Sequence, residues 1–122
     1  MIVQQEWYLT DEAAKAFEPS VVRANFGWPE FFEWLASPSG CIWNIGNQGW
    51  VFTIVNEADE LEILLCGGRD SKACAQAFEQ AAIAHPAHKG MTMRLEGRPA
   101  WRRIFKHWNC DANGVLTRAI EG

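Results

Sequence analysis

The segment from residue 61 to residue 110 constrains the fold of this chain more than any other. Residues 61–66 are typical of a buried strand, and Gly67 and Gly68 are expected to break it. An amphipathic helix pattern follows, and a second strand pattern, MTMRLEG, begins after Gly90. A strand, a helix and a strand of this length are most easily joined as a parallel pair with a right-handed crossover. The end of a strand that leads into a helix N-terminus is also a standard place to bind phosphate.

Two helices are expected within this segment. Asp70 or Ser71 is a suitable cap for the first helix. Its apolar stripe is expected to contain Cys74, Phe78, Ala81, Ala82 and His85. The turn at residues 97–99 then leads into a last helix, whose apolar face is expected at Trp101, Ile104, Phe105 and Trp108.

The N-terminal part of the chain predicts a first strand and two helices. Residues 2–8 form the strand pattern, and Thr10 is a suitable N-cap for a short helix with acidic residues in its first turn. A second helix is expected to begin at Trp28, because Pro29 is suited to a first helical turn. Residues 37–40 are expected to end it.

A β-hairpin is expected next. Two runs rich in β-branched and aromatic residues flank a glycine-containing turn at residues 46–49. Trp43 and Trp50 are expected to lie across from one another on the two strands. Together with residues 61–66, these strands predict an antiparallel meander, so the fold class is α+β with a mixed sheet.

Composition narrows the class of protein further. With 122 residues and 48% apolar residues, the chain fits one globular domain over residues 1–122. No apolar run approaches the roughly 20 residues needed to cross a bilayer, so we expect a cytoplasmic protein with no membrane partner. The net charge of −4 gives no reason to expect nucleic-acid binding. Three scattered histidines and the absence of a CxxC pair predict no metal site.

The order of elements over residues 41–120 resembles the GNAT (Gcn5-related N-acetyltransferase) superfamily. In that family a central strand leads into a turn of the form Q/R-x-x-G-x-G/A, which holds the pyrophosphate of acyl-CoA. The matching run here is residues 69–74, RDSKAC, which keeps the leading Arg69. Lys72 and Cys74 replace the two small positions, and a lysine brings a side chain into the path of the pyrophosphate.

The resemblance implies a site for acetyl-CoA and a set of reacting groups. The implied cofactor-binding residues are Cys66, Gly67, Gly68, Arg69, Lys72 and Ala73. Phe105 stands where the family has its tyrosine general acid, and His107 is the candidate substitute. Glu62 is the candidate general base for a small-molecule or peptide amine, although strand alternation also fits a solvent-facing carboxylate.

Two functions therefore stay open. The first is a divergent, weakly active acyl-CoA-dependent N-acyltransferase. The second is a non-catalytic binding or assembly protein, because the run GRPAWRR at residues 97–103 resembles GNAT-like proteins of bacteriophages, including some linked to head assembly. Such a protein would act in the host cytoplasm or the virion. The second helix, with aromatic residues on more than one side, also fits self-association or a protein partner.

Overall fold

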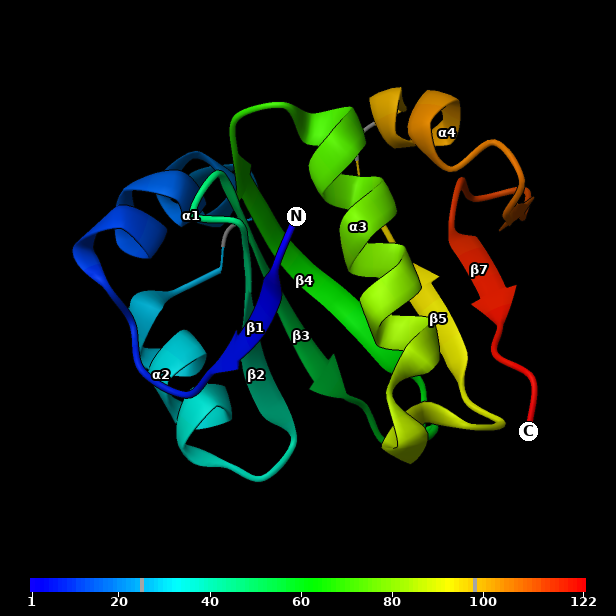
Figure 1. Ribbon diagram of the computed structural model, residues 1–122, viewed down its shortest axis with the longest axis horizontal. Helices are drawn as coiled ribbons and strands as arrows, with labels where there is room; N and C mark the ends of the chain where they lie inside the picture. Colours follow the sequence, from blue (N-terminus) through cyan, green and yellow to red (C-terminus); the bar gives the residue numbers. More distant parts are fainter. Residues whose placement is uncertain (25, 98) are drawn as a thin grey trace.

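The structure, a computed structural model, describes residues 1–24, 26–97 and 99–122. The described chain forms one seven-stranded mixed sheet with helices on both faces (Figure 1). The elements in chain order are β1 (Val3–Glu6), α1 (Asp11–Ala24), α2 (Trp28–Ala36), β2 (Gly40–Ile45), β3 (Gly49–Val55), β4 (Leu61–Gly68), α3 (Ser71–Ala84), a short 3-10 turn (Pro86–His88), β5 (Thr92–Leu95), α4 (Ala100–Ile104), β6 (Asn109–Cys110) and β7 (Leu116–Ala119).

The strand order across the sheet is β1-β2-β3-β4-β5-β7-β6. The pairing of β4 with β5 is parallel, and the other pairings are antiparallel. The predicted α+β class and mixed sheet are therefore confirmed, as is the parallel pair joined through α3. In the described residues no helix is both long enough and apolar enough to span a membrane.

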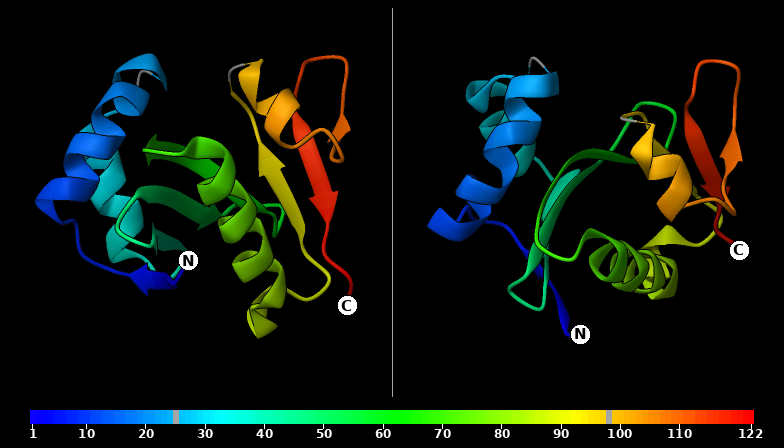
Figure 2. Two further views of the ribbon diagram at one scale, coloured as in Figure 1. Left: turned by 45° about the horizontal axis from the view of Figure 1, so that its top comes forward. Right: turned by 90° about the horizontal axis from the view of Figure 1, so that it is seen from above.

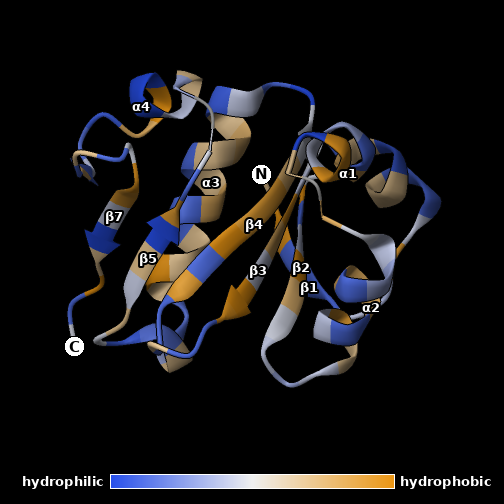
Figure 3. Cartoon of the chain, turned by 180° about the vertical axis from the view of Figure 1, so that it is seen from behind, coloured by the Kyte–Doolittle hydropathy of each residue, from blue (hydrophilic) through white to orange (hydrophobic). Residues whose placement is uncertain are grey.

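Each face of the sheet has its own apolar core. Helix α3 covers one face, and α1 and α2 cover the other (Figure 2). The α3-side core is built around Trp43, Ile63, Phe78 and Met93, all at most 3% exposed. The α1-side core contains Phe17, Phe31, Ile42, Phe52 and Leu65. Strands β3 and β4 contribute to both cores and carry much of the apolar sequence (Figure 3).

The first two helices form where the sequence predicts them. The Thr10 hydroxyl accepts a hydrogen bond from the Ala13 N–H at 3.2 Å, which caps α1. Helix α1 then continues for 14 residues and contains Pro19, so it is longer than expected. Helix α2 begins at Trp28 with Pro29 in its first turn, and it buries Phe31 and Leu35.

The hairpin of β2 and β3 is confirmed, but its predicted tryptophan pair is wrong. The register places Trp43 opposite Val51 and Asn44 opposite Trp50. Successive side chains of a strand point to opposite faces, so this one-residue offset sends the two rings to different cores. Trp43 lies in the α3-side core, and its indole N–H donates to the Thr53 hydroxyl at 2.9 Å. Trp50 lies in the α1-side core.

Strand β4 contains an irregularity, and beyond it the odd-numbered side chains point to the opposite face of the sheet. Its register against β3 shifts between Phe52 and Thr53, where Leu64 is the extra residue. Before the shift Ile63 packs in the α3-side core, and after it Leu64 and Leu65 both pack against the α1-side core. One inserted residue of this kind is a β-bulge, which bends a strand and increases its twist. Contrary to the prediction, Gly67 and Gly68 do not break the strand but form its last two residues.

The last helix is much shorter than the sequence pattern suggests. Helix α4 ends at Ile104, and Phe105 leaves the helical conformation with φ −105° and ψ 46°. The exit brings the Phe105 and Trp108 rings to 4.5 Å, and both side chains are buried. The helical spacing therefore identified two buried residues, Phe105 and Trp108, and two partly buried ones, Trp101 and Ile104, but it assigned the first two to the wrong element. Arg98, within the turn predicted to start this helix, lies outside the described residues.

Candidate functional site

A cavity opens in the described structure where β4 leaves β5. The parallel pairing joins only Leu61–Ile63 of β4 to Met93–Leu95 of β5, although β4 continues to Gly68. The bulge at Leu64 follows directly after the last paired residue. Beyond it lies a cavity of about 220 Å³, lined from α1, β2, β3, β4, β5, α3 and α4. The walls of this cavity therefore come from both faces of the sheet, with α1 on one side and α3 on the other.

The N-terminus of α3 forms one wall of the cavity. Ser71, the first residue of the helix, lines it. The N-cap residue Asp70 is in the left-handed region with φ 50° and makes no side-chain capping hydrogen bond, contrary to the predicted cap. The first N–H groups of a helix have no partner within the helix and carry a partial positive charge. This wall is therefore suited to an anionic group.

The structure brings four of the six predicted cofactor-binding residues to the cavity. These four are Cys66, Gly67, Gly68 and Arg69. Lys72 and Ala73 lie in the first turn of α3 but are not among the residues that line the cavity. The sequence predicted that the long side chain of Lys72 enters the path of the pyrophosphate. In the structure this side chain does not line the cavity.

The two glycines have structural roles in addition to bordering the cavity. A Cβ atom on Gly67 would lie 1.9 Å from the Ala16 carbonyl oxygen, so α1 packs directly on the backbone of β4. Gly68 has φ +122°, which favours glycine, and a Cβ there would lie 2.3 Å from the Gln48 carbonyl oxygen. Close packing of α1 at Gly67 brings the last turn of that helix to the cavity.

The inner wall is apolar and aromatic. Phe78 and Phe105 line it and are fully buried, and Trp101 completes this side. Cys74 also lines the cavity, and its thiol donates to the Arg69 carbonyl oxygen at 3.3 Å. Burial raises the pKa of the Cys74 thiol, and the negative charge of Asp70 raises it further. Cys74 therefore stays protonated at neutral pH and acts as a small apolar side chain.

Glu62, the candidate base, lies away from the cavity. It is on the part of β4 that pairs with β5, and it is not among the lining residues. Its carboxylate accepts a hydrogen bond from the Asn56 side-chain amide at 3.2 Å and lies 3.5 Å from the Arg94 guanidinium. The Glu62 side chain is 21% exposed, so it is a partly shielded ion pair rather than a free solvent-facing carboxylate.

His107, the candidate acid, belongs to a different cluster. Its Nε2 lies 2.7 Å from a carboxylate oxygen of Glu79, which also accepts from the Trp108 indole N–H at 2.7 Å and from Arg118. Burial alone would raise the pKa of Glu79, but the hydrogen bonds from His107, Trp108 and Arg118 outweigh it and the pKa lies below the usual value. We call these four residues the Glu79 cluster; it ties α3 to the chain after α4 and to β7.

Sequence reasoning missed two polar residues of the cavity. Arg23, in the last turn of α1, and Trp50, on β3, both line it. Nothing in the sequence links Arg23 to residues 66–69, because the link is the close packing of α1 at Gly67. Trp50 was expected to lie across from Trp43, whereas the observed register places it opposite Asn44. Within the described residues no group of three or more histidine, cysteine or acidic side chains is placed to hold a metal ion.

Comparisons with known proteins do not identify a family. No model of a protein family, no curated protein and no solved structure matches the chain significantly. The cavity and its residues are therefore the features of this chain from which a function can be inferred.

Proposed function

We propose that this chain is a GNAT-like domain that binds acetyl-CoA in the cavity and transfers the acyl group slowly to an amine. The observation that carries the proposal is the separation of β4 from β5 beside the uncapped N-terminus of α3. The antiparallel run β2-β3-β4, followed by a parallel crossover through α3, supports the resemblance drawn from the sequence.

The residues at the cavity fit the chemistry of this cofactor. The N–H group of Ser71 at the start of α3 and the guanidinium of Arg69 would hold the diphosphate, since both residues line the cavity. The apolar wall formed by Phe78 and Phe105 suits the reactive end of the molecule, because burial there excludes water. When bound, acetyl-CoA supplies a thioester whose acetyl carbon bonds to the amine nitrogen as the C–S bond breaks and the amine proton ends on the sulfur.

Slow transfer is expected because the cavity offers little acid–base assistance. Among the described lining residues, no histidine, tyrosine or carboxylate is present. Glu62 and His107 are occupied by other partners, and Phe105 has no proton to donate. The cavity would then act by binding and orienting the two reactants, which can itself lower a barrier substantially.

Calorimetric titration with acetyl-CoA and with free CoA tests this proposal. We expect micromolar binding of both, with Arg69→Ala weakening it by about tenfold because a charge-assisted hydrogen bond is lost. Arg103→Ala is the matched control, since Arg103 is exposed on α4 and does not line the cavity. The absence of heat and of any thermal shift at millimolar CoA would overturn the proposal.

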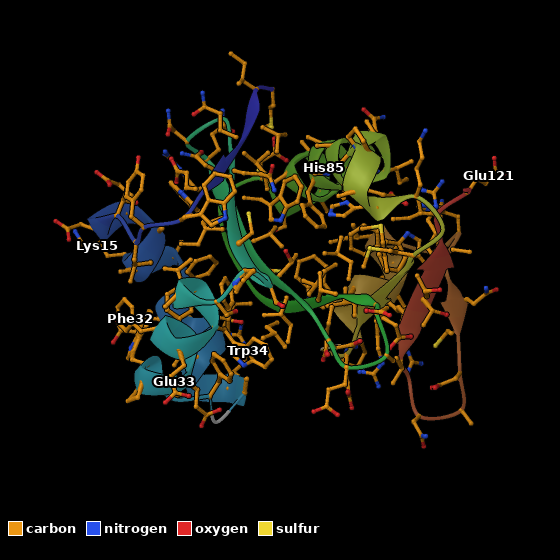
Figure 4. All side chains as sticks on the ribbon, turned by 90° about the horizontal axis from the view of Figure 1, so that it is seen from below. Lys15, Phe32, Glu33, Trp34, His85 and Glu121 are labelled. Carbon is orange, nitrogen blue, oxygen red and sulfur yellow. The ribbon has the colours of Figure 1, made fainter. Side chains whose placement is uncertain are left out.

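A second candidate function is non-catalytic assembly through the edge of the sheet. Strand β1 is an edge strand, and Trp7 and Tyr8 beside it are 60% and 63% exposed. Exposed backbone groups and aromatic side chains at a sheet edge favour pairing with another chain. On α2, Phe32 is 51% exposed and points to a different side from Trp34 (Figure 4).

Light scattering coupled to size exclusion tests this second candidate. Self-association that disappears in Trp7→Ser, and persists in the control Lys15→Ser, would support it. A monomer at high micromolar concentration, with no partner retained on a column of the immobilised protein, would count against it.

A further inference from the structure

Trp50 carries a buried hydrogen-bond donor without a partner. The side chain lines the cavity and is 8% exposed, and its Nε1 has no hydrogen-bond partner among the described residues. An indole N–H can only donate, and a buried donor left unpaired reduces stability. The other buried tryptophans of the described residues, Trp43 and Trp108, both donate their indole N–H to an acceptor. The Trp50 N–H is therefore a donor at the cavity for which the described residues supply no acceptor.

Arg23 adds a positive charge at the same cavity. It lies in the last turn of α1, lines this cavity and a neighbouring one, and forms no ion pair with the described residues. Arg23 and Arg69 are the ionised side chains among the described lining residues, and both are cationic. A ligand whose only charge is positive would meet like charge in the cavity, whereas a carboxylate would meet two guanidinium groups and an indole donor.

We propose that the α1 side of the cavity binds the carboxylate of the acyl acceptor, so that the acceptor is an apolar α-amino acid. This inference rests on the proposed function at one point, which is that the bound carboxylate ligand is the acceptor of the acyl group. Arg69, next to the N-terminus of α3, is left for the cofactor, and Arg23 and the Trp50 N–H bind the carboxylate. The apolar side chain of the ligand would pack on Trp101 and Phe105, which line the same cavity.

A matched pair of probes isolates the carboxylate. L-phenylalanine and L-phenylalaninamide differ in that group alone, and each is titrated calorimetrically into the full chain. We expect the acid to bind about tenfold more tightly than the amide, as for a lost charge-assisted hydrogen bond. Arg23→Ala should remove most of this preference, and Arg23→Lys should keep part of it because the charge remains.

Two further variants complete the test. Trp50→Phe should weaken binding of the acid several-fold through loss of its N–H. Lys15→Ala, on the exposed part of α1 and away from the cavity, should leave binding of both probes unchanged. Arg23 is exposed, so its variants should fold, and circular dichroism checks this.

The outcomes separate this inference from the proposed function. A preference for the acid that depends on Arg23, together with no binding of acetyl-CoA, would support the carboxylate site and refute acyl transfer. Binding of acetyl-CoA with equal affinity for acid and amide, or with a preference unchanged in Arg23→Ala, would overturn the carboxylate site alone. Failure of both probes to bind at millimolar concentration would also overturn it.

Discussion

Buried polar groups are paired in the Glu79 cluster but not on the side of the cavity that Trp50 and Arg23 line, which we call the Trp50 side. Glu79 is 5% exposed, and its carboxylate accepts hydrogen bonds from His107, Trp108 and Arg118. Trp50 is similarly buried, yet its indole N–H has no partner among the described residues. A fold tolerates a buried charge when that charge is fully paired. An unpaired buried donor, by contrast, lowers the free energy of unfolding.

This difference distinguishes a structural cluster from a candidate binding site. The Glu79 cluster includes His107, which the sequence suggested as a catalytic acid, and its hydrogen bonds connect three parts of the chain. The Trp50 side contains an apolar cavity, an unpaired donor and unpaired positive charge. The unpaired indole N–H of Trp50 thus marks a different site from the one that His107 and Glu79 form.

The largest effect is expected from removing the acceptor of the Glu79 cluster. Glu79→Ala leaves Arg118 and the Trp108 N–H without their partner, and we expect a loss of about 3 kcal/mol in the free energy of unfolding. Urea unfolding followed by circular dichroism measures it, with Gln80→Ala on the exposed side of α3 as control. A loss no greater than that of the control would mean that the cluster does not stabilise the fold.

A smaller loss is expected from Gly67→Ala, which disturbs the Trp50 side. The added Cβ would meet the Ala16 carbonyl oxygen at 1.9 Å, so α1 must move, at a cost of about 2 kcal/mol. Gly27→Ala is the control, because its nearest neighbour is the Pro29 Cδ atom at 3.5 Å. Equal stability of the two variants in thermal unfolding would contradict the close packing of α1 on β4.

Two identical substitutions then compare the two regions directly. Trp108→Phe removes a donor that Glu79 uses, and we expect it to destabilise the fold by about 1.5 kcal/mol. Trp50→Phe removes a donor without a partner, so apart from lost ring volume its cost should be lower by about 1 kcal/mol. Chemical unfolding of both variants at one pH gives the difference, and equal losses would refute the contrast.

The smallest effect concerns pH. The pKa of Glu79 is lower in the folded chain than the usual value of about 4.3, so its stabilising contribution is present above that value. It is lost as the pH falls through the folded pKa, because the carboxylate then binds a proton. The difference in unfolding free energy between the wild type and Glu79→Gln should therefore shrink below about pH 4. A difference that stays constant between pH 7 and pH 3 would contradict the assignment.

Local patterns in the sequence predicted most of the fold. The Thr10 cap, the start of α2 at Trp28-Pro29, and the β2–β3 hairpin are all present, because each depends on residues near in sequence. The parallel pairing of β4 and β5 was also predictable from the order strand, helix, strand. The wrong predictions concern places where tertiary contacts determine the ends of helices and strands. Phe105 leaves α4 to pack with Trp108, and Gly67 stays in β4 because α1 packs on it.

The candidate site was predictable only in part. Residues 66–69 line the cavity because the end of β4 lies next to the start of α3, which a sequence can reveal. Arg23 and Trp50 reach the same cavity from α1 and β3, and their positions depend on the packing at Gly67 and on a hairpin register offset by one residue. Neither this packing nor this register can be predicted from the spacing of residues in the sequence.

The central claim, that the cavity is a ligand site, is tested most directly on the indole N–H resonances of the protein. Trp50→Phe and Trp108→Phe assign the two signals in a proton–nitrogen correlation spectrum. With L-phenylalanine added in the presence of CoA, we predict that the Trp50 signal shifts and exchanges more slowly with water, while the Trp108 signal does not change. A Trp50 signal that stays unchanged at saturating concentrations of both ligands, or that changes only as much as Trp108, would contradict the account.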